Sequence, residues 1–215
     1  MTRTGEHPAP ERLHSPGRLE AFGDGVFAIA ITLLVLEIAV PAVSGTELLH
    51  GLAVQWPAYL AYGMSFFSIG VLWIAHYGVT RALRGVDALF LRLNLLFLFF
   101  VAFLPYPTRL LAEYLTDKAG ERVAVTVYAL TLLAISVTLR LMWHYATEDR
   151  RLLADDITDE QVGATNTTLT PALGFYAIAV GLGLVAPLAA VALLVLAIVF
   201  LAIPSRDIHR WLHRR

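Results

Sequence analysis

Long apolar segments separated by short polar segments dominate the chain. Most of these segments approach the roughly 20 residues that an α-helix needs to cross the hydrocarbon core of a bilayer. Pro41 ends the first segment, and Pro187 separates the last two. The pattern predicts an all-α membrane protein with six transmembrane helices per chain, at about residues 19–41, 52–78, 88–112, 123–146, 168–186 and 188–204.

The polar segments define the rest of the organisation. Residues 1–17 contain three prolines and no apolar core, so we expect a cytoplasmic tail and not a signal peptide. A short polar turn should follow Pro41, and residues 147–167 are charged, which predicts a loop or an interfacial helix. Residues 205–215 form a basic tail after a single membrane domain over residues 18–204.

Composition narrows the classes of function. Hydrophobic residues make up 58% of the 215 residues, with a mean hydropathy of +0.67, which excludes an ordinary soluble domain. The absence of cysteine excludes disulfides, iron–sulfur clusters, thiolate zinc sites and a cysteine nucleophile. Neither a serine nucleophile elbow nor an HExxH motif occurs. We therefore expect no enzyme activity, no cofactor, no metal site and no nucleic-acid partner.

The basic residues assign a side of the membrane to each loop. With six spans, thirteen of the sixteen lysines and arginines lie on the side that holds both termini. Loops that carry an excess of lysine and arginine are normally cytoplasmic. The sequence therefore predicts a multi-pass protein of the cell (inner) membrane with both termini in the cytoplasm.

The first apolar segment carries an unusual polar pattern. Asp24 lies within its first turns, and a carboxylate at that depth is costly unless it faces protein or water. Ile29, Thr32, Leu33 and Leu36 follow at the i, i+3, i+4 and i+7 spacing that places residues on one helix face. We take this face as the candidate working surface, although the spacing alone fits lipid contact as well as pore lining.

Two later spans contain polar residues that could accompany Asp24. Trp73 and His76 lie in the second span, and Asn94 lies in the third. We predict a network of these residues with Asp24, in which His76 is the best partner for the carboxylate. Arg18 lies six residues before Asp24, about 240° around the helix, so these two cannot pair along one face.

Arg18-x-x-x-Phe22-x-Asp24 at the start of the first span is a recognisable motif. Together with later segments it resembles the transmembrane protein 175 family of potassium channels, over about residues 18–115. Gly23 stands where the family motif usually has serine, which removes a hydroxyl from the start of the helix. The later matching segments are Gly70–Val71–Leu72–Trp73–Ile74–Ala75–His76, Asp87, Leu93–Asn94 and Phe103–Leu104–Pro105–Tyr106–Pro107.

The resemblance implies a homotetrameric channel domain in which four first helices line a pore for potassium ions. It implies a constriction built from Ile29, Leu33 and Leu36, with Thr32 beside it. Rings of aliphatic side chains can gate by dewetting and make an ion shed part of its hydration shell. Glu37 is four residues after Leu33, on the same side of a continuous α-helix, and would then lie near the outer mouth and attract cations.

Other functions stay open at this stage. Asp24, His76 and Glu37 could act as relay groups in a proton-conducting or proton-coupled carrier, and an unperturbed histidine changes charge between pH 5 and 8, the range that such a role requires. A structural subunit without transport activity is also compatible with the sequence. In every case we expect the bilayer and further copies of the chain as partners.

Overall fold

The computed structural model describes residues 13–202, and within this range the chain is all α-helical apart from turns, isolated backbone pairs and short 3-10 segments. This confirms the predicted fold class. The helices are α1 (Gly17–Leu33), α2 (Leu48–Val54), α3 (Trp56–Arg81), α4 (Ala88–Phe103), α5 (Pro105–Tyr114), α6 (Glu121–Thr147), α7 (Asp159–Val185) and α8 (Pro187–Ala202), and the 3-10 segments are η1 (Leu34–Glu37), η2 (Gly45–Glu47) and η3 (Glu148–Arg150).

Five of the predicted spans appear as helices long and apolar enough to cross a membrane. They are Gly17–Glu37, Trp56–Arg81, Ala88–Tyr114, Glu121–Arg150 and Asp159–Val185. The third comprises α4 and α5, which meet where Pro105 and Pro107 remove backbone donors from the helix. The sixth appears as α8, whose 16 residues measure about 24 Å. Residues 205–215, predicted as a tail, lie outside the described residues, as do residues 1–12.

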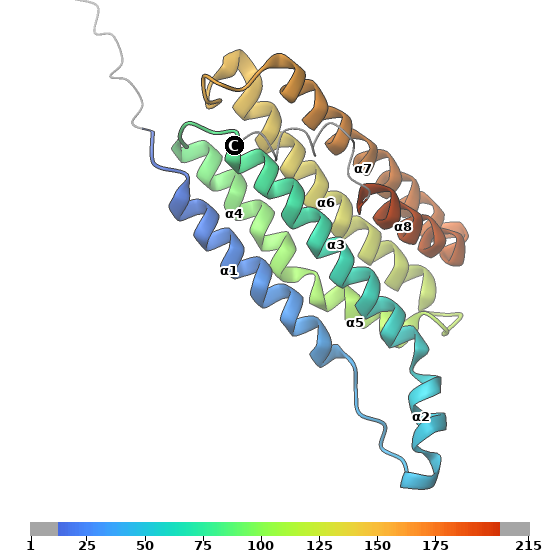
Figure 1. Cartoon of the computed structure of the whole chain (residues 1–215). Coiled ribbons are helices and arrows are strands. Elements are labelled where there is room, and N and C mark those ends of the chain that lie inside the picture. Colours follow the sequence, from blue (N-terminus) through green and yellow to red (C-terminus); the bar gives the residue numbers. More distant parts are fainter. Residues whose placement is uncertain (1–12, 203–215) are drawn as a thin grey trace, which may run out of the picture.

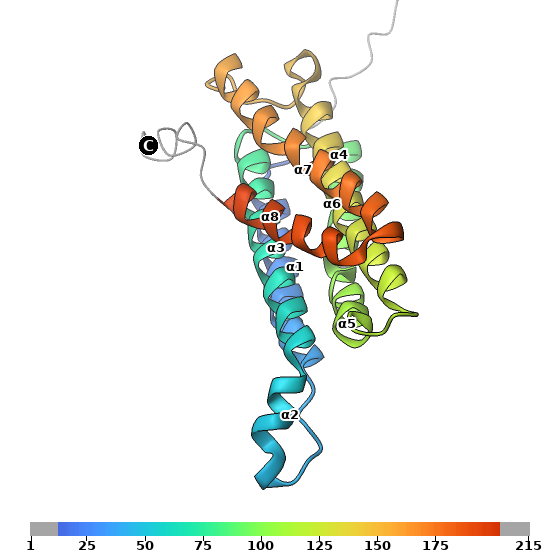
Figure 2. The same cartoon turned by 90° about the vertical axis from the view of Figure 1, so that its right-hand side faces the viewer.

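The helices are arranged around α6. Figure 1 shows α1 beside α3 and α4, with α7 and α8 on the far side of α6 from α1. Figure 2 shows α8 crossing the other helices obliquely. Large side chains of α6, including Tyr128, Leu132, Ile135 and Trp143, are fully buried, whereas α1 lies at the edge of the bundle.

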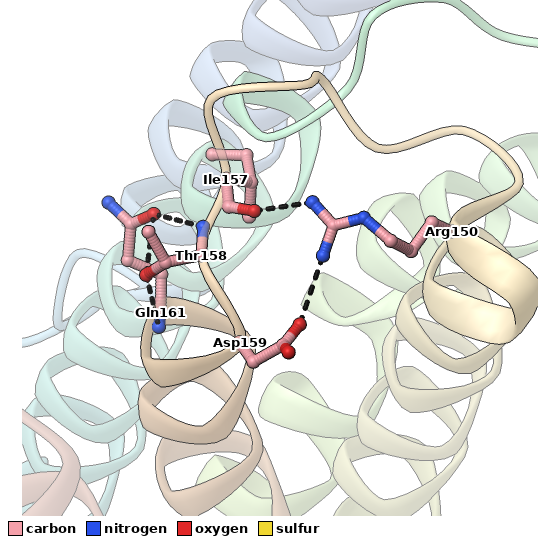
Figure 3. A network of polar contacts seen from close by, with 5 residues as sticks. All are labelled: Arg150, Ile157, Thr158, Asp159 and Gln161. Atoms are coloured by element: carbon pink, nitrogen blue, oxygen red, sulfur yellow. Dashed lines mark hydrogen bonds and ion pairs between the residues drawn. The ribbon is translucent and has the colours of Figure 1, made fainter.

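The fifth span begins earlier than hydropathy predicts. Residues 147–167 are predicted as a loop or an interfacial helix, and their second half is instead the first part of the long apolar helix α7, which starts at Asp159. Thr158 and Gln161 form a reciprocal capping box, which satisfies free backbone donors at the helix start. Arg150 donates to Asp159 and to the carbonyl of Ile157, so the preceding loop is fixed to the same turn (Figure 3). Hydropathy misses these turns because they are helical but polar.

The segment between the first and second spans also differs from the prediction. In place of a short polar turn before a helix at residue 52, residues 38–55 form a projection that we call the arm. It comprises an extended limb, η2 and α2, and it projects beyond the rest of the bundle (Figures 1 and 2). We call this end of the molecule the arm end, and the opposite end, where α1 begins, the loop end.

Backbone hydrogen bonds hold the loop end together. His14 and Val86 exchange two bonds of 2.8 and 2.9 Å, and Arg84 N–H donates to the Leu152 carbonyl at 2.9 Å. Asp87 is buried and caps α4 by accepting from Phe90 N–H at 2.8 Å, while its second oxygen accepts from the Tyr145 hydroxyl. The start of α1, the α3–α4 turn and the loop after α6 are therefore one connected layer.

Removing the Asp87 carboxylate should destabilise this layer. Asp87→Ala leaves the Phe90 N–H and the Tyr145 hydroxyl without their acceptor. The loss of the helix cap and of the hydrogen bond from Tyr145 should lower the free energy of unfolding by about 2–3 kcal/mol. Thermal unfolding of the purified protein in detergent should shift down by about 4–12 °C. Asp155→Ala, at an exposed position of the neighbouring loop, is the matched control. Equal melting of the two variants would contradict the assignment.

Candidate functional site

One face of α1 is buried and the other is exposed. Leu19, Gly23, Phe27 and Ala30, spaced every three or four residues, are buried against α3 and α4, and Leu34 of η1 continues the same face. The opposite face carries the stripe singled out by spacing. Its members are Ile29 (61% exposed), Thr32, Leu33 (41% exposed) and Leu36 (73% exposed).

Glu37 lies in a different place from the one expected for it. The chain changes from α to 3-10 geometry at Leu34, and a 3-10 helix turns 120° per residue. Leu36 therefore stays on the side of Leu33, three residues earlier, while Glu37 rotates away, and its side chain is only 22% exposed. The expectation that Glu37 shares the face of Leu33 assumed a continuous α-helix.

Glu37 instead faces α5. Its carboxylate lies 3.9 Å from Arg109 Nε, and this nitrogen also donates to Glu113 at 2.8 Å. A pocket of about 400 Å³ opens beside these groups. Gln55 lines the same pocket, and its side-chain oxygen is buried without a hydrogen-bond partner in the described chain.

The predicted intramembrane network forms two separate pairs. Trp73 Nε1–H donates to Asp24 Oδ1 at 2.8 Å, so tryptophan and not histidine holds the carboxylate. His76 Nε2 lies 2.8 Å from the side-chain oxygen of Asn94, within hydrogen-bonding distance, so His76 pairs with α4 and not with Asp24. The His76 ring also stacks on Phe97, with centroids 5.0 Å apart and planes 4° from parallel.

Gly23 lies between the two pairs. A Cβ atom at Gly23 would lie 3.2 Å from His76 Cε1, so α1 and α3 are in close contact at this level. The pairs therefore share one layer of the bundle, in which the buried side of α1 touches His76 and its exposed side holds Asp24.

Arg18 and Phe22 complete the motif, and both are exposed. Arg18 has no hydrogen bond or ion pair with any described residue, which agrees with the expectation that it does not pair with Asp24 along the helix. Exposed polar groups at the start of a membrane-crossing helix require water, lipid headgroups or another protein surface.

Three residues that contact these polar groups were missed from the sequence. Phe97 follows Asn94 by three residues on α4, a spacing that places both beside the same neighbour. Arg109 and Glu113 have the i, i+4 spacing of a helical ion pair, which the sequence contains. Among the described residues, no cluster of histidine and carboxylate side chains could hold a metal ion.

Comparison with known proteins agrees with this arrangement. Residues 18–105 match the family described as "Endosomal/lysosomal potassium channel TMEM175". A protein of Streptomyces collinus, named a potassium channel, is 40% identical over 203 residues, which cover 91% of this chain and 98% of the relative. The chain belongs to the TMEM175 family.

Solved and animal relatives extend the comparison. The crystal structure of a protein from Chamaesiphon minutus, described as a homologue of a lysosomal potassium-selective TMEM175 channel, matches with a TM-score of 0.79 and 39% identity. The match covers 87% of this chain and 96% of that one. A human TMEM175 protein, named an endosomal/lysosomal proton channel, is 33% identical over 61% of this chain and 28% of its own length.

The close approach of α1 to His76 predicts how Gly23 tolerates substitution. Gly23→Val adds methyl groups where the first carbon alone already approaches His76 at 3.2 Å, so it should separate α1 from α3 and lower the melting temperature. Gly163→Val is the control, since it introduces the same residue into a helix where no atom lies within 4 Å of the added carbon. We expect Gly23→Val to lower the free energy of unfolding by about 1–3 kcal/mol more than the control does. Equal costs would show that this contact is absent.

Proposed function

We propose that the chain is a potassium-permeable cation channel, assembled as a homotetramer in which four copies of α1 surround a water-filled path. The observation that carries the proposal is the two-sided character of α1. Its buried face is used within the subunit, while the side chains of Ile29, Leu33 and Leu36 are exposed on the surface of the described subunit. Relatives named potassium channels support the same interpretation.

In this assembly the aliphatic stripe forms the constriction. Ile29 and Leu33 are four residues apart in α geometry, and Leu36 follows in 3-10 geometry, so the three rings span about 12 Å of the path. An ion that passes such rings loses part of its hydration shell and gains no charged ligand in return. Potassium holds its water less tightly than sodium, so the barrier is lower for potassium and selectivity is modest.

Thr32 adds a polar atom to this surface. Its hydroxyl lies 2.9 Å from the carbonyl oxygens of Ala28 and Ile29, so its hydrogen is held by the helix backbone. A hydroxyl oxygen keeps acceptor capacity when its hydrogen is donated. In the tetramer four such oxygens would face the ion between the rings of Ile29 and Leu33.

The charge pattern orients the channel. With both termini in the cytoplasm, the loop end is cytoplasmic and the arm end is external. Asp24 would then lie near the cytoplasmic entrance, held by Trp73. Glu37 would lie near the outer entrance, where Arg109 neutralises part of its field.

Flux measurements on the purified protein test the proposal. In liposomes loaded with potassium, Leu33→Ala should raise flux and reduce discrimination between potassium and sodium, because the constriction is wider and less apolar. Leu184→Ala, at an exposed position of α7, removes the same atoms away from α1 and should leave both quantities unchanged. If Leu33→Ala behaved like the control, the stripe would not be the constriction, and silent liposomes would indicate a subunit without transport activity.

Arg109 provides a separate electrostatic prediction. Arg109→Gln leaves Glu37 without its cation, so potassium flux should rise at low salt and return to the wild-type level at high salt, where charges are screened. Lys118→Gln removes the same charge from an exposed position in the α5–α6 turn and should have the smaller effect. Equal effects of the two variants would mean that the Glu37 pair has no special influence on permeation.

A second candidate is proton conduction. The name of the human relative favours it, and so does the presence of Asp24 and His76 in one layer of the bundle. The contacts of the described residues do not link Asp24, His76 and Glu37 into a relay. His76 is paired with Asn94, and Glu37 lies 13 residues beyond Asp24, about 20 Å along the helix.

Opposed gradients of potassium and protons across a planar bilayer separate the two functions. A reversal potential that follows potassium supports the first candidate, and one that follows pH supports the second. In the second case His76→Ala should flatten the pH dependence of the current, and an unchanged pH dependence would exclude His76 from the path.

A further inference from the structure

The arm, residues 38–55, is a built structure and not a loose connection. Gly51 of α2 packs against the extended limb. A Cβ atom added to Gly51 would lie 3.0 Å from Pro41 Cβ and 3.1 Å from Val43 Cγ2. The turn between the limbs is closed by a 3.0 Å bond between the hydroxyls of Ser44 and Thr46 and by Glu47 N–H donating to the Ser44 carbonyl. The arm therefore presents a defined surface.

That surface is apolar and has no partner in the described chain. No residue of α2 is buried, and Val40 and Leu49 are 87% and 81% exposed. Glu47 is the only aspartate, glutamate, lysine or arginine in the arm. A rigid apolar projection of this kind normally marks an interaction site.

When the helices stand upright in the membrane, the hydrocarbon core of the bilayer does not extend as far as the arm. α3 alone has 26 residues and measures about 39 Å, more than the roughly 30 Å of that core. Trp56 at the start of α3 is exposed and suits the interface, so α2 lies beyond it. The arm also lacks the lysines and arginines that attract anionic lipid headgroups.

Its position favours a second copy of this chain as the partner. The arm begins where η1 ends and continues the long axis of α1 (Figure 1). Leu36 and Val40, four residues apart, are both largely exposed, so the apolar surface of α1 runs on into the arm. Wherever four copies of α1 meet around an axis, their arms start beside that axis and beside one another.

We propose that the arm packs against the arm of a neighbouring copy, so that four arms form a collar around the outer entrance of the channel. This inference rests on the proposed tetramer. The collar removes Val40 and Leu49 from water and joins the copies outside the bilayer, where apolar association is driven by water. Within the bilayer that driving force is absent, because lipid tails are as apolar as the side chains.

The lack of cysteine makes the collar directly testable. Leu49→Cys introduces the single thiol of the protein, which can be labelled in the purified channel with a water-soluble maleimide. In the assembled channel labelling should be at least tenfold slower than at Lys118→Cys, an exposed turn position, and the two rates should converge once sodium dodecyl sulfate has dissociated the copies. A fluorophore can be attached at Leu49→Cys under dissociating conditions, and the labelled protein is then reassembled into vesicles. Spin-labelled lipid should not quench this fluorophore, whereas it should quench a fluorophore at Leu188→Cys on α8.

Each alternative environment of the arm gives a different result. Labelling of Leu49→Cys as fast as Lys118→Cys would show an arm free in water, and quenching by lipid would show an arm in the membrane; either overturns the collar. Leu49→Glu supplies an independent measurement, because it should reduce the tetramer fraction in detergent at least severalfold compared with Lys118→Glu. An unchanged tetramer fraction also overturns the collar. A freely labelled arm in a protein that still shows the Leu33→Ala flux effect would refute the collar and leave the channel intact.

Discussion

The packing of one face of α1 on α3 and α4 is the constraint on which the rest of the structure depends. Phe27 and Ala30 are buried in that contact, and Gly23 lets the helix approach His76 closely. Because an α-helix divides its residues between two faces, burial of this face commits Ile29, Leu33 and Leu36 to the other. The subunit thus presents an exposed apolar helix face on the side of α1 away from α3 and α4.

Polar side chains stabilise this arrangement by pairing locally. Trp73 satisfies Asp24, and Asn94 satisfies His76, so neither titratable group is left alone in an apolar layer. At the loop end Asp87 connects α4 to α6, and at the arm end Arg109 connects η1 to α5. The first helix is therefore held to α3 through Asp24, and its 3-10 extension is held to α5 through Glu37, which favours a stripe of constant orientation.

The change of helix type at Leu34 sets the direction of the side chains that follow it. It keeps Leu36 in line with Leu33 and turns Glu37 toward Arg109. The proposed path is therefore apolar through its constriction, and its outer charge is shared with a guanidinium group. The arm follows directly, so these four residues lie at both the proposed outer entrance and the start of the proposed collar.

The sequence by itself determined the helical class, five of the spans and the stripe on one face of α1, and it singled out the polar residues that form the Asp24–Trp73 and His76–Asn94 pairs. Hydropathy and helical periodicity are local properties, which is why they suffice for these features. Only the tertiary structure decided that Trp73 holds Asp24, that Glu37 turns toward α5, that α7 begins at Asp159 and that residues 38–55 project as an arm. Those outcomes depend on which neighbour offers a donor, a cap or a close backbone contact, and residue spacing carries no information about neighbours that are distant in the sequence.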